Sequence, residues 1–275
     1  LEQAGLVVKR KSGTGYYDRF RNRIMFPIQD SIGRFIGFGG RTLEQGGDTP
    51  KYINTNENPL FHKGRNLYGL FSAEEHIRKK DLAFITEGYI DVIRMHQAGF
   101  ANTVAPLGTA LTGEQVDVLL RYTRNICLLF DPDEAGSKAA LKSISLLHGR
   151  GVDPSVVRLP SGTDPGDFFD SYSPEDFQLL VEEARSGVAF LLHEVAGSRK
   201  TYSAQEKIRI LRALAEQYRN MGDPVLQEEL LSGASSLLHL DHALVGREIE
   251  RLQGTSSESL NRASAPVPEK KRKAV

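Results

Sequence analysis

Residues 81–160 alternate between short apolar runs and amphipathic stretches. The apolar runs occupy 82–88, 102–108, 125–131 and 155–160, and the amphipathic stretches fill 89–100, 112–123 and 137–151. Strands that alternate with helices predict right-handed βαβ units and a mainly parallel sheet. The runs are continuously apolar, which is typical of strands whose two faces are both covered by helices. This part of the chain therefore predicts an α/β fold.

The first 80 residues show a different pattern, rich in turns and β-forming residues. Two apolar runs flank "QDSIGR" at 29–34, which predicts a hairpin. The "GFGG" at 37–40 supplies backbone freedom or a place for a ligand to come close. It is not a dinucleotide fingerprint, because no helical pattern opens there. Residues 50–70 are polar and aromatic with weak periodicity, and we expect an ordered loop.

Beyond residue 170 the pattern is helical. Ser173 precedes Pro174 as an N-cap before a proline, and Ser203 with Glu206 forms a capping box. Residues 254–268 are linker-like, and a basic tail follows in which "KKRK" is either a disordered end or a nucleic-acid contact. The sequence thus predicts a helical bundle followed by a flexible segment.

Composition indicates an ordinary globular protein. The chain has 275 residues, of which 40% are hydrophobic and 25% charged, a length typical of about two domains. No apolar run approaches a membrane span, and the start has no signal-peptide layout, so we expect a cytoplasmic protein without a membrane partner. Cys127 is the only cysteine, which excludes an internal disulfide framework and a Cys-based zinc site.

Charge is unevenly distributed along a chain whose formal net charge is zero. Residues 1–80 contain 14 Lys and Arg against 8 Asp and Glu. This excess predicts an anionic partner for the first part of the chain. A solvated surface balanced by acids elsewhere explains the charge alone equally well.

Carboxylates follow two of the predicted strands. Glu87 ends the first, Asp131 ends the third, and Asp133 follows two residues later. Ligands of open α/β sheets bind at the carboxyl ends of strands, so neighbouring strands would bring these acids to one edge. Carboxylates held close together repel one another unless a cation lies among them. Oxygen-only ligands favour Mg²⁺ or Mn²⁺ over zinc, and such ions serve phosphoryl chemistry.

Three further acids are candidates for the same edge. Asp91 follows Glu87 by four residues near the start of a helix, and Asp164 and Asp167 follow the fourth strand. Taken one at a time, each is also explained by a helix cap or an Asx-turn. The seven histidines include no pair with zinc-motif spacing.

Several motifs resemble those of a known family. "ITEGYIDV" followed by "LLFDPDEAG" resembles the Toprim signature, which primases, topoisomerases, recombination proteins and some nucleases share. "YYDRFRNRIMFPI", "GFGGRTL", "PKYINT" and "LFHKGRNLYGL" resemble motifs in the RNA polymerase domain of the bacterial DnaG-type DNA primases. The resemblance covers about residues 1–170 and continues more weakly to about 252.

The resemblance implies a domain order and an activity. The order is a mixed α+β, β-rich subdomain at 1–80, a Toprim subdomain with a mainly parallel sheet at 81–170, a helical subdomain at 171–253 and a flexible basic tail at 254–275. The implied activity is template-directed synthesis of RNA primers from NTPs on single-stranded DNA. Two alternatives stay open: a Toprim nuclease or topoisomerase-like enzyme, and a single-stranded DNA-binding fragment without catalysis.

The resemblance also assigns residues. Glu87, Asp131 and Asp133 would be catalytic and hold Mg²⁺, with Mn²⁺ as a substitute, while Asp91, Asp164 and Asp167 would add to the acidic pocket. The basic residues expected along the template and nucleotide path are Arg19, Arg21, Arg23, Arg41, Lys51, Lys63 and Arg65. The physics agrees, because basic residues offset the charge of template and triphosphate.

Two departures from the family pattern affect these expectations. The family often has "DPD" after the fourth strand, whereas this chain has "DPGD", so Gly166 is no ligand and replacement by Asp167 stays open. The family's N-terminal zinc-binding and C-terminal helicase-binding domains are not in this sequence. We therefore expect a monomeric fragment without zinc, whose parent protein contacts the replicative helicase through an absent domain and whose own activity the sequence leaves open.

Overall fold

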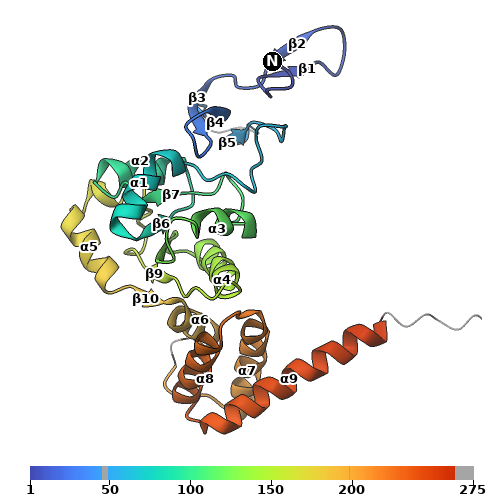
Figure 1. Cartoon of the computed structure of the whole chain (residues 1–275), viewed down its shortest axis with the longest axis vertical. Coiled ribbons are helices and arrows are strands. Elements are labelled where there is room, and N and C mark those ends of the chain that lie inside the picture. Colours follow the sequence, from blue (N-terminus) through green and yellow to red (C-terminus); the bar gives the residue numbers. More distant parts are fainter. Residues whose placement is uncertain (45–48, 198, 264–275) are drawn as a thin grey trace, which may run out of the picture. The chain divides into compact units, whose positions relative to one another are not determined.

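The computed structural model describes residues 1–44, 49–197 and 199–263, with side chains described as far as Gln253. The chain divides into two compact units, Leu1–Phe190 and Leu191–Val275 (Figure 1). The first unit contains all the strands of the described residues, and the second is helical.

A five-stranded sheet organises most of the first unit (Figure 1). Its order is β10-β9-β8-β6-β7, with bounds Arg185–Ser186, Ser155–Val157, Ile126–Leu129, Ala83–Ile85 and Thr103–Val104. Strands β6 to β9 run parallel and β10 pairs antiparallel with β9. The predicted α/β fold class with a mainly parallel sheet is confirmed.

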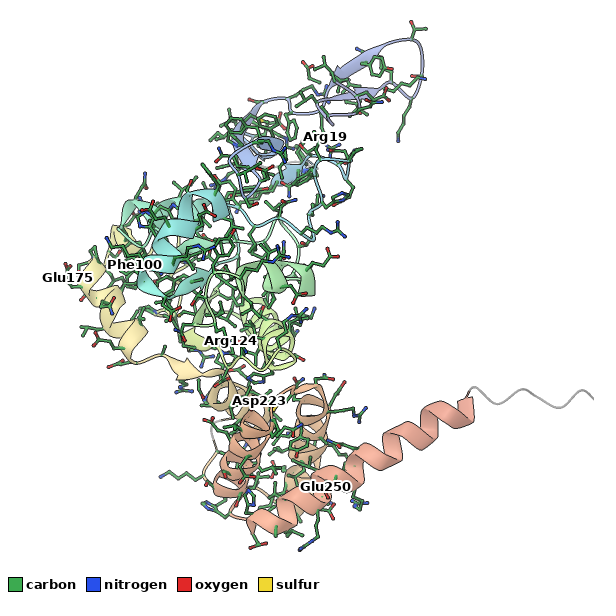
Figure 2. All side chains as sticks on the ribbon, in the orientation of Figure 1. Arg19, Phe100, Arg124, Glu175, Asp223 and Glu250 are labelled. Atoms are coloured by element: carbon green, nitrogen blue, oxygen red, sulfur yellow. The ribbon has the colours of Figure 1, made fainter. Side chains whose placement is uncertain are left out.

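Helices cover both faces of this sheet, which explains why the central strands β6 and β8 are apolar throughout. The helices of the first unit are α1 (Leu70–Lys80), α2 (Tyr89–Gln97), α3 (Gly113–Leu119), α4 (Glu134–His148) and α5 (Pro174–Glu182). Ile85 and Leu128 pack with α1, α3 and α4, whereas Phe84 and Leu129 pack on the opposite face with α2 and α5. Phe100, labelled in Figure 2, lies against Phe177 of α5 with ring centroids 4.6 Å apart.

A smaller antiparallel sheet precedes the parallel one. It consists of β3 (Arg23–Gln29), β4 (Phe35–Thr42) and β5 (Tyr52–Asn54), after a short hairpin of β1 (Val7–Lys9) and β2 (Tyr16–Asp18). The predicted hairpin at 29–34 is confirmed as the turn between β3 and β4. Strand β5 corrects the expectation that 50–70 is loop throughout, because three residues there pair with β4.

The "GFGG" stretch is explained by close packing against aromatic rings. A Cβ atom at Gly39 would lie 2.6 Å from Cζ of Tyr89, and one at Gly40 would lie 2.8 Å from Cδ1 of Phe20. Tyr89 stacks on Phe26 with centroids 4.9 Å apart and donates a hydrogen bond of 2.7 Å from its hydroxyl to Asn54 Oδ1. Gly39 therefore admits the Tyr89 ring, which joins the small sheet to α2, and Gly40 admits the ring of Phe20.

The second unit is formed by α7 (Ala204–Asn220), α8 (Pro224–Leu238) and α9 (His242–Ala263), while α6 (Gly187–Ala196) crosses the boundary. The predicted capping box is present, since Ser203 accepts a hydrogen bond from the Glu206 backbone N–H. Apolar residues form its buried core: Leu211, Leu214, Leu230, Ala234, Leu238, Val245 and Ile249.

Two predicted boundaries differ from the structure. Residues 171–190 belong to the first unit, because β10 pairs with β9 and Phe177 is buried against the parallel sheet. Helix α9 continues to Ala263 and so extends into the segment that was predicted to be a linker from residue 254. The "KKRK" tail lies outside the described residues. The division of residues 1–170 into two subdomains stays a prediction.

Within the described residues, no helix is both long and apolar enough to cross a membrane.

Candidate active site

The topology brings the two strand-end acids together. Glu87 follows β6 and Asp131 follows β8, and these strands are parallel neighbours with Ile85 opposite Leu128. The backbone N–H of Asp131 donates a hydrogen bond of 3.1 Å to Oε1 of Glu87. The predicted meeting of Glu87 and Asp131 at one sheet edge is therefore confirmed in the structure.

Asp91 and Asp164 face the same edge from a helix and a loop. Asp91 lies in the first turn of α2, where its Oδ2 accepts a hydrogen bond of 2.9 Å from the Gly88 N–H. Gly166 lies between the two carboxylates: a Cβ atom there would be 3.2 Å from Asp164 Oδ1 and 3.3 Å from Asp91 Oδ1. Oδ1 of Asp164 accepts a hydrogen bond of 2.7 Å from the Asp167 N–H, which fixes the turn.

These acids line one cavity of about 430 Å³. Its acidic residues are Glu87, Asp91, Asp131, Asp164 and Asp167. Arg41, Lys51, Tyr52 and Asn54 line the same cavity from β4, β5 and the segment between them. The cavity is therefore acidic where the parallel strands end and carries two cations from the small sheet.

Crowding and burial shift the pKa of two acids upward. The pKa of Asp91 is raised to about 7, mainly by burial and also by the charges of Asp131, Asp164 and Glu87, while the Gly88 hydrogen bond acts in the opposite direction. Burial raises the pKa of Asp131 to about 6, with Glu87, Asp164 and Asp133 acting in the same direction and Lys51 in the opposite one. Like-charge repulsion of this kind is relieved by a bound cation.

The arrangement does not enclose a metal ion with protein side chains alone. In the described parts of the chain, no group of three His, Cys, Asp or Glu side chains has the geometry to hold a metal ion. The oxygen-only donor set instead suits a hydrated Mg²⁺ or Mn²⁺, because Mg²⁺ usually keeps several waters and binds only one or two carboxylates.

Comparison with known proteins gives the family. The DNA primase catalytic core, N-terminal domain, matches residues 1–74, and the Toprim-like family matches residues 84–169. A DNA primase domain from Pseudomonas aeruginosa has a solved structure that is 33% identical with a TM-score of 0.82, covering 90% of this chain and 78% of that one. The chain belongs to the DnaG-type DNA primase family.

Other primases show the same likeness. A DnaG primase catalytic domain whose structure holds single-stranded DNA is 34% identical with a TM-score of 0.78, covering 88% of this chain and 76% of that one. The DNA primase of Synechococcus elongatus is 41% identical over 222 residues, and that of Staphylococcus aureus strain COL is 36% identical over 253. The matches cover 78% and 90% of this chain but only 32% and 41% of those two primases.

Asp133, assigned to metal binding from the primase resemblance, caps a helix, whereas Asp131 lines the cavity. It is the N-cap of α4, and its Oδ1 accepts a hydrogen bond of 2.7 Å from the Gly136 N–H. It is exposed and does not line the acidic cavity, although its charge raises the pKa of Asp131. Its role as a metal ligand stays a prediction.

The seven basic residues assigned from the primase resemblance separate into groups. Only Arg41 and Lys51 line the acidic cavity, with the Arg41 guanidinium 5.8 Å from the centroid of the Tyr52 ring. Arg19 donates from Nε and Nη2 to the Asn54 carbonyl, and Arg23 donates to the Gly40 and Pro50 carbonyls. These two arginines hold the backbone around β5.

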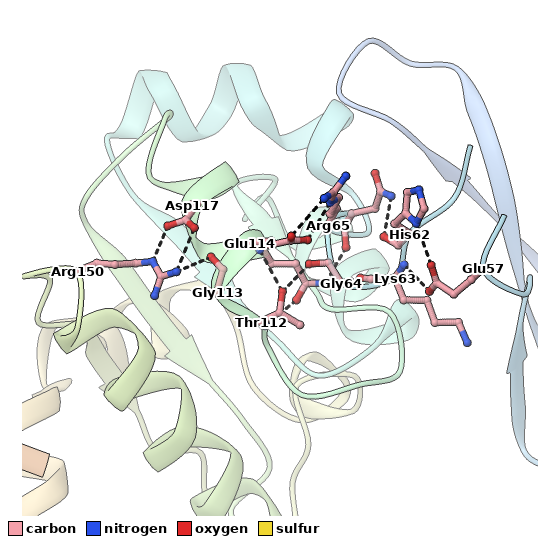
Figure 3. Close-up of polar contacts among 12 residues, drawn as sticks. Glu57, His62, Lys63, Gly64, Arg65, Thr112, Gly113, Glu114, Asp117 and Arg150 are labelled. Carbon is pink, nitrogen blue, oxygen red and sulfur yellow. Dashed lines mark hydrogen bonds and ion pairs between the residues drawn. The ribbon is translucent and has the colours of Figure 1, made fainter. Parts of the chain in front are cut away.

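The remaining three lie away from the acids. Arg21 is exposed, with its guanidinium 5.1 Å from the centroid of the Tyr17 ring. Lys63 and Arg65 belong to a loop that Figure 3 shows against the start of α3. Thr112 and Gln115 bond carbonyls of this loop, and Arg65 pairs with Glu114 at 2.9 Å. The structure therefore does not bring these cations to the acidic cavity.

Sequence reasoning missed several residues of this primase pocket. Tyr52 and Asn54 line it, and Asn54 also donates a hydrogen bond of 2.8 Å to the Leu107 carbonyl. Sequence reasoning also missed Arg94, which donates a hydrogen bond to the Gly166 carbonyl in the loop that carries Asp164. The motif "PKYINT" contains the first two, but only the antiparallel pairing of β4 with β5 turns them toward the acids.

Proposed function

We propose that this chain provides the catalytic centre for template-directed synthesis of RNA primers from NTPs on single-stranded DNA. One observation carries the proposal: Glu87 and Asp131 meet at neighbouring strand ends and share a cavity with Arg41 and Lys51. Acids that suit a metal ion and cations that suit phosphate are the two requirements of phosphoryl transfer. Family membership supports the same activity, and one relative was solved with single-stranded DNA bound.

The acids are assigned to a divalent metal. Glu87 and Asp131 would hold a hydrated Mg²⁺, for which Mn²⁺ can substitute, with Asp133 as a further proposed ligand from outside the cavity and with Asp91, Asp164 and Asp167 completing the acidic pocket. The raised pKa values of Asp91 and Asp131 support this, because a cation favours the ionised form of both. When bound, the metal supplies charge stabilisation at the reacting phosphoryl oxygens.

The other pocket residues bind and orient. Lys51 and Arg41 offset negative charge on a triphosphate or template phosphate that enters beside the acids. The Asn54 side chain is held by hydrogen bonds with the Tyr89 hydroxyl and the Leu107 carbonyl, and it lines the cavity beside these two cations. Water is displaced from a concave site of this kind when nucleotide enters, which strengthens each charged contact.

The proposed partners and location are those of the full-length protein. The partners we propose are the DNA template, NTPs, the RNA primer product and the replicative helicase, the last through a domain outside this chain. We propose a monomer that acts in the bacterial cytoplasm. The chain spans 32% and 41% of the length of two primases that it matches, so these partners are assigned to the full-length protein.

The test is Asp131→Ala in the full-length protein, assayed for primer synthesis on single-stranded DNA. We expect synthesis to fall about 100-fold or more, since a transition-state charge contact is lost. Glu134→Gln is the matched control, because Glu134 begins α4 three residues after Asp131 and pairs with Lys138 outside the cavity. Undiminished synthesis by Asp131→Ala overturns the proposal, and metal-dependent nicking of DNA by the wild-type chain would favour a nuclease instead.

A further inference from the structure

The acidic loop after β9 is held by turn hydrogen bonds that join its own residues to one another and do not reach α2. Asp167 donates its N–H to Oδ1 of Asp164 at 2.7 Å, and the Phe168 N–H donates to the Asp164 carbonyl at 3.0 Å. Phe168 is buried in the core between the sheet and α5 and anchors the end of the loop. The stretch that places Asp164 and Gly166 beside α2 needs a further contact.

The stretch from Asp164 to Gly166 lies close to carboxylates of the same charge as Asp164. Gly166 lies beside both the Asp91 and the Asp164 carboxylate, because a Cβ atom there would be within 3.3 Å of an oxygen of each. The charge of Asp164 raises the pKa of both Asp91 and Asp131, so the loop is repelled by the acids that it approaches. This repulsion favours a position of the loop farther from the cavity.

Arg94 supplies a restraint from α2. It lies one helical turn after Asp91, and its Nε donates a hydrogen bond of 2.7 Å to the Gly166 carbonyl. Its Nη2 pairs with the carboxylate of Asp170, at the far side of the loop. A planar guanidinium binds two acceptors at once in a fixed geometry, which a lysine does not. Arg94 is half-buried and so is partly shielded from solvent.

We propose that Arg94 is a positioning residue, which clamps the 164–170 loop onto α2 so that the Asp164 carboxylate stays in the acidic cavity. Both contacts of the Arg94 guanidinium go to the loop, to the Gly166 carbonyl and to the Asp170 carboxylate, so its proposed action is on the position of the loop. The inference rests on the proposed function only in that the cavity binds a divalent metal. It explains how a chain with glycine at 166 keeps its loop acids in place.

Arg150 offers a matched control. It too joins a carbonyl and a carboxylate, donating to the Gly113 carbonyl at 3.0 Å and pairing with Asp117 at 2.5 Å (Figure 3). It ties α3 to the end of α4 and does not line the acidic cavity. Arg150→Ala therefore removes an equivalent clamp while leaving the acids unchanged.

The experiment compares the 275-residue chain with its Arg94→Ala, Arg94→Lys and Arg150→Ala variants. Mn²⁺ binding is followed by electron paramagnetic resonance of the free ion, and amide hydrogen exchange is followed in the metal-free proteins. We expect Arg94→Ala to raise the Kd for Mn²⁺ about tenfold, as for loss of a group that orients ligands. Lysine should recover only part of this, and Arg150→Ala should bind as the wild type does.

Exchange separates the two proposals. The Asp167 and Phe168 N–H groups should exchange faster in Arg94→Ala and at the wild-type rate in Arg150→Ala. Unchanged exchange in Arg94→Ala overturns the positioning role whatever the metal does. An equal loss of Mn²⁺ binding in Arg150→Ala also overturns it, because the effect would then be general destabilisation. A wild-type chain that binds no Mn²⁺ would instead remove the metal site from the proposed function, and exchange would still decide the clamp.

Discussion

Glu87 accepts a hydrogen bond of 3.1 Å from the backbone N–H of Asp131, which links the ends of two parallel strands through a side chain of the candidate active site. The same carboxylate raises the pKa of Asp131 by its charge. Glu87 therefore has two separable contributions, an acceptor oxygen and a negative charge.

Glu87→Gln keeps an acceptor oxygen and removes the charge, whereas Glu87→Ala removes both. We expect both to reduce primer synthesis by the full-length protein about 100-fold or more. Only Glu87→Ala should also lose stability, by about 1 kcal/mol, because the Asp131 N–H loses its partner. Urea unfolding of the three proteins checks this, and equal stability of the two variants would show that the hydrogen bond contributes nothing.

Gly166→Ala should destabilise the acidic loop, because the added Cβ would lie 3.2 Å from Asp164 Oδ1 and 3.3 Å from Asp91 Oδ1. We expect a loss of about 1 kcal/mol in unfolding free energy and weaker Mn²⁺ binding. Gly64→Ala is the control, since its Cβ would meet only Thr112 Cγ2, at 3.8 Å. Stability equal to that of the wild type in Gly166→Ala would contradict the close packing.

Gly39→Ala should destabilise the contact between the small sheet and α2. The new Cβ would lie 2.6 Å from Tyr89 Cζ, and forced overpacking costs about 1–3 kcal/mol. The double variant Gly39→Ala with Tyr89→Leu should lose less than the sum of the single losses, because the smaller side chain admits the methyl group. Thermal unfolding of the four proteins measures this coupling, and strict additivity would exclude the clash.

Cys127 should make stability fall at alkaline pH. Burial raises the pKa of its thiol from 9.0 to about 11. Between these values the unfolded chain has released a proton that the folded chain retains, so the free energy of unfolding decreases as pH rises. Below pH 9 the thiol contributes no such slope.

The measurement for Cys127 is urea unfolding from pH 8 to 11, compared with Cys127→Ala to subtract the titration of other groups. The wild type should lose up to about 2 kcal/mol more than the variant over this range. In the native protein the thiol should also resist alkylation by iodoacetamide, because it is fully buried in β8. Parallel pH profiles for the two proteins would refute the shift.

The sequence allowed prediction of features set by local pattern and strand direction. Glu87 and Asp131 each follow an apolar run, and parallel strands place such ends at one edge, so their meeting could be inferred. The turn around Asp30 and the capping box of Ser203 likewise depend only on nearby residues. These are the parts in which short-range chemistry decides the structure.

Other features depend on partners distant in sequence. The residue string does not show that Arg23 reaches the Gly40 and Pro50 carbonyls or that Arg94 reaches Gly166. The assignment from the primase resemblance therefore grouped Arg19 and Arg23, which bond backbone carbonyls, with Arg41, which does line the cavity. Strands β5 and β10 were missed because each is only two or three residues long and gains its stability from the neighbour that it pairs with.

The parallel sheet ends in two very short strands, β10 and β7, which contain two residues each. Unpaired strand edges are the usual starting point for association between chains, and a two-residue edge offers little backbone to a foreign strand. The three strands between them, β9, β8 and β6, are each paired on both sides. This arrangement should protect the folded protein from aggregation while leaving its strand ends open to the acidic cavity.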